Sequence, residues 1–127
     1  MRSSCRDRGE VKRAFIGDYL HLIDSFAELE SQPKVFVCLP TLPSKVAANH
    51  DEAIGIRRET GGLDASIEAV AKLRNVTLID LEWVVDDAAL SVDGAHPDES
   101  GARSIAVAIH AALMADAVKS PSPMAPR

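Results

Sequence analysis

The run Asp93-Gly94-Ala95-His96-Pro97 places a carboxylate and an imidazole at a spacing that can support catalysis. A carboxylate three residues before a histidine, with small residues between, can fold back and accept the Nδ1 proton. It would thereby fix the tautomer of His96 and leave Nε2 as a base. Pro97 restricts His96 to extended geometry, which directs its ring away from a following helix. Asp-Gly is also a common turn, and a histidine before a helix is often a solvated cap, so both interpretations stay open at this point.

The other histidines are weaker candidates. His21 lies on a charged helix side, His110 lies off an apolar stripe, and His50 stands beside two acidic residues in a loop. No pair has the spacing of metal ligands such as H-E-x-x-H, so we expect neither a metal site nor a cofactor. Cys38 lies in an apolar run and Cys5 in a polar start, which argues against a disulfide.

The first four expected elements lie between residues 10 and 74. Helical spacing predicts a helix over residues 10–30, and Pro33 ends it. The short apolar run 34–39 predicts a strand covered on both faces. Residues 41–62 read as a long loop with at most one helical turn, residues 63–74 as a short amphipathic helix. The apolar positions of the first helix form one line with a second line beside it: Phe15, Tyr19, Leu22, Phe26 and Leu29, then Ile16, Leu20, Ile23 and Ala27.

The remaining expected elements lie directly before and after the motif in the sequence. Residues 76–81 predict a second strand, and residues 82–92 a short helix and turn in which Trp83 packs beneath the strand's end. Asp98 is expected to cap a final helix. The apolar stripe of that helix is Ala102, Ile105, Ala106, Ile109, Ala112 and Leu113. Residues 1–9 are expected to be a flexible start, residues 10–118 the folded part, and residues 119–127 a disordered Ser/Pro tail.

This alternation of strands and helices predicts an α/β fold with the two strands parallel and paired. Two strands are too few for an independent sheet, so the pattern looks like half of a domain. The strand 34–39 would then keep one bare edge without a charge in its middle, which favours aggregation, a molten ensemble or self-association through that edge.

A family resemblance adds to this interpretation. The block Asp93-Gly94-Ala95-His96-Pro97-Asp98, followed by Gly101 and Ile105-Ala106, resembles the last conserved block of SGNH (GDSL-type) hydrolases. Residues 15–24, 33–40 and 70–81 resemble the preceding helices and last two strands of that family, nearest to sialate O-acetylesterase-like and related carbohydrate acetylesterases. Asp98 stands where asparagine is common. The resemblance implies a partial flavodoxin-like three-layer fold.

The resemblance also implies roles. Asp93 would orient His96, which would activate a serine to deacetylate an O-acylated carbohydrate. The family's serine block, G-D-S, and its oxyanion blocks with glycine and asparagine do not occur here. Ser3 and Ser4 lie in the polar start, and Asn49 and Asn75 lie in the wrong places. Met1 falls about where the third block would have ended, so we expect the chain alone to be inactive.

Composition and charge limit the classes of binding partner that we expect for this chain. Fourteen basic and nineteen acidic side chains give a net charge of −5, which disfavours nucleic-acid binding. No apolar run reaches the roughly 18 residues of a membrane span, and the polar start does not resemble a signal peptide, so a cytoplasmic location is the default. Three hypotheses stay open: a gene remnant without activity, half of a split esterase completed by an N-terminal fragment, and a non-catalytic binding module that uses the long loop.

Overall fold

The computed structural model describes residues 7–45, 50–59, 62–90 and 94–119. The chain divides into two compact units, one of residues 1–39 and 49–80 and the other of residues 40–48 and 81–127. The first unit holds α1 (Arg8–Ala27), β1 (Phe36–Leu39), α2 (His50–Arg58), α3 (Leu63–Arg74) and β2 (Thr77–Asp80). The second holds a 3-10 turn, η1 (Asp87–Ala89), and α4 (Glu99–Lys119).

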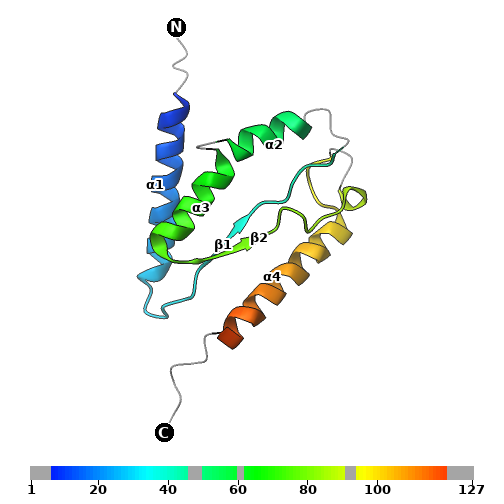
Figure 1. Ribbon diagram of the computed structural model, residues 1–127. Coiled ribbons are helices and arrows are strands. Elements are labelled where there is room, and N and C mark those ends of the chain that lie inside the picture. Colours follow the sequence, from blue (N-terminus) through cyan, green and yellow to red (C-terminus); the bar gives the residue numbers. More distant parts are fainter. Residues whose placement is uncertain (1–6, 46–49, 60–61, 91–93, 120–127) are drawn as a thin grey trace. The chain divides into compact units, whose positions relative to one another are not determined.

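The two strands of the first unit run parallel, as predicted from the sequence. Phe36 pairs with Thr77 and Leu39 with Asp80, so the register is continuous over four residues. The connection between the strands contains α2 and α3; α3 packs on both strands, and α1 lies beside α3 (Figure 1). The coarse α/β class is therefore confirmed, with a sheet of two strands in the order β1-β2.

The core of the first unit lies between the two helices and one face of the sheet. Its buried side chains are Ile23 of α1, Val37 and Leu39 of β1, and Ile67, Val70 and Ala71 of α3. Val37 and Leu39 are two residues apart, so they point to the same face of the sheet. Phe36 and Cys38 are only half-buried. Burial raises the pKa of the Cys38 thiol, which disfavours the reactive thiolate.

Helix α1 differs from the predicted helix over residues 10–30 in its bounds, and its apolar lines are buried unequally. It stops at Ala27, after which the chain turns through Gln32, whose φ is 45°. Phe15 and Tyr19 do face the core, and their rings stack 5.6 Å apart. Leu22, Phe26 and Leu29 were expected on the same line, but each is about half exposed. From the neighbouring line Ile23 is buried, and Ile16 and Leu20 are partly buried against the core, as Phe15 and Tyr19 are.

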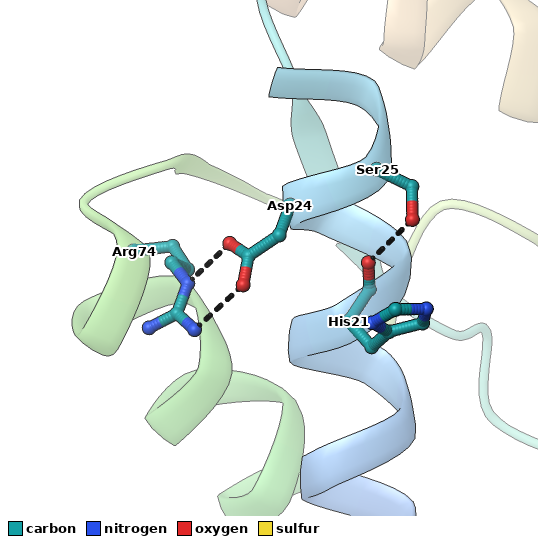
Figure 2. Close-up of polar contacts among 4 residues, drawn as sticks. All are labelled: His21, Asp24, Ser25 and Arg74. Carbon is teal, nitrogen blue, oxygen red and sulfur yellow. Dashed lines mark hydrogen bonds and ion pairs between the residues drawn. The ribbon is translucent and has the colours of Figure 1, made fainter. Parts of the chain in front are cut away.

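An ion pair fastens α1 to the end of α3. The Arg74 guanidinium donates to both carboxylate oxygens of Asp24, at 2.7 and 2.9 Å (Figure 2). These hydrogen bonds hold the pKa of the Asp24 carboxyl below its usual value. Directly after Asp24, Ser25 Oγ donates to the carbonyl of His21 at 2.8 Å, a contact within α1. The pair links residues fifty positions apart, which no local pattern could indicate.

Residues 41–62 hold more than the single helical turn expected, because α2 occupies nine of them. Asp51 and Glu52 stand in its first turn and Arg57 and Arg58 in its last, which suits the helix dipole at both ends. The corner between α2 and α3 is tight: a Cβ on Gly62 would come within 2.3 Å of the Ile56 carbonyl oxygen. The sequence prediction underestimated this helix because α2 is short and mostly polar.

A buried ion pair holds this corner. Arg57 Nη2 lies 3.0 Å from Asp64 Oδ1, and Arg57 Nε donates to the same oxygen at 3.1 Å. Both side chains are largely buried. The second oxygen of Asp64 is buried without a hydrogen-bond partner. Arg57 therefore compensates a carboxylate that water cannot reach.

In the second unit, residues 82–90 hold turns and the short 3-10 helix η1, which agrees with the predicted short helix and turn. Trp83, however, is 65% exposed rather than packed. On α4, Ile105, Ile109 and Ala112 are half-buried, but Ala102, Ala106 and Leu113 of the expected stripe are exposed. Among the described helices α4 alone has the length and apolar composition of a membrane span, although little of it is buried. The lack of an uninterrupted apolar run in the sequence therefore does not exclude a membrane span at α4.

Candidate functional site

The predicted site lies in the second unit, where three short segments meet. One segment, residues 40–45, directly follows β1, and another, residues 81–90, directly follows β2. The third, residues 94–98, leads into α4. Leu42 donates its amide to the Glu82 carbonyl at 3.2 Å, which joins the first two segments. The Lys45 amide lies 3.2 and 3.3 Å from the two carboxylate oxygens of Asp87, which adds a second tie between them.

The turn that carries His96 is held to the first of these segments. Gly94 has a φ of 69°, a left-handed conformation that favours glycine. Its carbonyl accepts a hydrogen bond of 2.7 Å from the amide of Ser44. The glycine after Asp93 is thus needed to bend the chain, and the bend places its carbonyl on the segment after β1.

The same turn is held to the second segment on its other side. Pro97 forms an isolated antiparallel bridge with Leu90. The amide of Asp98 donates to the Ala89 carbonyl at 2.9 Å. His96 is therefore flanked in sequence by two residues, Gly94 and Pro97, that are each fixed to a different part of the unit.

The first turn of α4 completes the support. Asp98 Oδ1 accepts a hydrogen bond of 2.9 Å from the Gly101 amide, which confirms the predicted N-cap. Gly101 is buried, and a Cβ there would lie 2.5 Å from the Ala89 carbonyl oxygen and 2.9 Å from the Pro97 Cβ. The glycine lets the helix approach η1 and the proline more closely than any other residue would allow.

His96 itself is exposed, at the bend before α4. The backbone on both sides of His96 is held by contacts, which would suit a base that has to reach a substrate. Asp93, the second predicted catalytic residue, lies outside the described residues. Its contact with His96 therefore stays a prediction.

Ser44 is a residue of this site that sequence reasoning missed. Its side chain is only 2% exposed, and its amide is the donor that holds Gly94. Such burial suits a packing role and disfavours a role as an attacking nucleophile. Its position, five residues after the end of a buried strand, was the one available signal, because open α/β sheets place site residues after strand ends.

The other sequence candidates do not join this site. Asn75 is the left-handed C-cap of α3, with φ 52°, which is a structural role. His21 and His110 are exposed on α1 and α4, and His50 begins α2. Ser3, Ser4 and Asn49 lie outside the described residues. Within the described part of the chain, no three His, Cys, Asp or Glu residues are placed to hold a metal ion.

Comparisons with known proteins leave the resemblance untested. No protein-family model matches the chain, and no curated protein or solved structure matches it either.

Proposed function

We propose that this chain supplies the Asp-His part of an SGNH-type serine ester hydrolase, and that the serine and the oxyanion donors come from polypeptide outside this sequence. The observation that carries the proposal is the support of His96. An exposed imidazole stands between Gly94, held by Ser44, and Pro97, bridged to Leu90. Capping of α4 does not explain this support of His96, because Asp98 already caps the helix.

In this proposal His96 acts twice. Nε2 takes the proton of the serine hydroxyl as the serine oxygen bonds to the acyl carbon, and the imidazolium returns that proton to the departing alkoxide. A water then gives a proton to His96 and bonds to the acyl carbon. The bond to the serine oxygen breaks, acetate leaves, and the serine recovers its proton. Asp93 would orient the ring and stabilise its charged form.

The proposed substrate is an O-acylated, specifically an O-acetylated, carbohydrate, and the proposed fold of the completed protein is flavodoxin-like. The parallel pair β1-β2, with α3 crossing between the strands, fits the last two strands of such a sheet. Both strands are followed directly by the segments that hold the His96 turn, which agrees with the usual position of sites in open α/β sheets.

Complementation tests this function. The purified chain would be mixed with a polypeptide that carries the G-D-S and G-x-N-D blocks of an SGNH acetylesterase and ends before its own Asp-x-x-His block. We expect the mixture to hydrolyse p-nitrophenyl acetate faster than the sum of the two parts. The gain should disappear in His96→Ala and persist in His110→Ala, a matched exposed histidine on α4.

Two results would contradict the proposal. One is a mixture no faster than its parts, although the two chains co-elute. The other is a gain that survives His96→Ala. Binding of an O-acetylated carbohydrate by the chain without any gain in hydrolysis would favour the binding-module alternative.

A further inference from the structure

The turn that carries His96 is held at two points of the second unit. On one side the Ser44 amide donates to the Gly94 carbonyl at 2.7 Å, and on the other the Asp98 amide donates to the Ala89 carbonyl at 2.9 Å. Because His96 lies between these two hydrogen bonds in the chain, the position of its backbone depends on the distance that is kept between Ser44 and Ala89.

One side chain ties these two points to each other. Asp87 stands two residues before Ala89 in η1, and its carboxylate oxygens accept the amide of Lys45, the residue after Ser44, at 3.2 and 3.3 Å. The contact closes a ring in which the other two hydrogen bonds join backbone atoms only. Asp87 is therefore the member of this ring whose contribution a substitution can remove.

We propose that Asp87 is a positioning residue for His96. By holding the Lys45 amide, its carboxylate fixes the distance between the segment 40–45 and η1, and therefore the backbone that carries the imidazole. The effect of Asp87 on the rate of hydrolysis rests on the proposed function, in which His96 is the base. Its effect on the position of His96 does not depend on that function.

The exposure of Asp87 separates positioning from stability. Its side chain lies at the surface. Breaking a hydrogen bond there changes the stability of a fold little, because water takes the place of the lost partner. A base, by contrast, must stay within hydrogen-bond reach of the proton that it takes, and a displacement of about 1 Å can lower the rate by about 100-fold. Removal of the carboxylate should therefore displace His96 while the chain stays folded.

NMR spectra of the histidine rings in the full chain test the position of His96. We expect Asp87→Ala to shift and broaden the ring signals of His96 and to speed hydrogen exchange of the Lys45 amide. The ring signals of the other three histidines and the urea midpoint of unfolding should stay unchanged. Asp87→Asn should keep the wild-type His96 signals, because its side-chain oxygen can still accept the Lys45 amide. Asp86→Ala is the matched control, since this neighbouring exposed carboxylate makes no capping hydrogen bond to η1.

The complemented mixture described above tests the consequence for catalysis. With p-nitrophenyl acetate, Asp87→Ala should lower kcat about 10- to 100-fold and change KM less than about twofold, and Asp87→Asn should recover most of the loss. If the mixture shows no gain in hydrolysis, the hydrolase function fails, and the His96 ring signals alone decide whether Asp87 positions the imidazole.

Four results would each overturn the proposal. They are unchanged His96 signals in Asp87→Ala, an equal change in Asp86→Ala, a change in Asp87→Asn as large as in Asp87→Ala, and an active mixture whose kcat is insensitive to Asp87→Ala. A fall in the urea midpoint that accounts for the altered His96 signals would also overturn it, because Asp87 would then act on the stability of the fold.

Discussion

At the scale of single residues, the support of His96 depends on two glycines for different reasons. Gly94 is needed for its left-handed backbone, and Gly101 for the space that a Cβ would fill. Both stand in the block that resembles the SGNH family, but the reason for Gly101 becomes visible only where α4 meets Ala89 and Pro97. In the proposed function, Gly101 would thus be required for the position of His96 without contacting the substrate itself.

Gly101→Ala should destabilise the second unit by about 1–3 kcal/mol, because backbone atoms near the new Cβ have little freedom to move. The measurement is amide hydrogen exchange at residues 94–101, where protection should fall. Gly17→Ala is the control: nothing lies within 4 Å of its Cβ position on α1, so it should stabilise the chain by up to about 1 kcal/mol. Unchanged exchange in Gly101→Ala would show that η1 adjusts without cost.

At the scale of elements, two ion pairs fasten helices to α3. The Arg57–Asp64 pair is buried at the corner with α2, and the Asp24–Arg74 pair is more exposed at the contact with α1. Loss of the buried pair should destabilise the fold more than loss of the exposed pair, since losing one partner of a buried pair leaves an uncompensated charge. Exposed pairs contribute little and are screened by salt.

Arg57→Leu should cost about 3 kcal/mol of unfolding free energy, because the Asp64 carboxylate already has one oxygen without a partner. The double variant Arg57→Leu/Asp64→Leu should recover most of that loss. Urea unfolding of the two variants at pH 7 measures the difference. If the double variant is no more stable than the single one, the loss comes from packing and not from the buried charge.

Asp24 should make stability depend on pH. Its pKa is lowered in the folded chain, so the ionised carboxylate stabilises the fold above its ordinary pKa of about 3.8. This contribution is lost as the pH falls through the folded-state pKa. Asp24→Asn should therefore be less stable than wild type at pH 7, and the difference should shrink towards pH 2. Arg74→Gln should show the same pH dependence, and combining the two changes should add almost nothing.

At the scale of the whole molecule, the chain holds a histidine whose flanking backbone is fixed and a sheet of two strands. We expect the chain alone to hydrolyse p-nitrophenyl acetate no faster than a denatured control, because the serine and oxyanion blocks of the resembled family do not occur in its sequence. A rate above this background that disappears in His96→Ala would contradict the expectation. Its loss in Ser4→Ala as well would identify Ser4 as the attacking residue.

Several features were determined by the sequence alone because they depend on neighbours in the chain. The helix 63–74 was predicted to the residue, Asp98 was predicted as a cap, and the runs 34–39 and 76–81 were predicted as parallel, paired strands. Apolar runs between prolines, and a capping side chain before a helix, need no distant contact to be recognised.

Only the tertiary structure decided which surfaces these elements use. Periodicity showed that α1 has a broad apolar side, but the position of α3 decided that Ile23 is buried and Leu22 exposed. The same holds for the exposure of Trp83 and the hydrogen bond from Ser44 to Gly94. Each depends on segments far apart in the chain, and a sequence pattern can show that a residue is suited to burial without showing what will cover it.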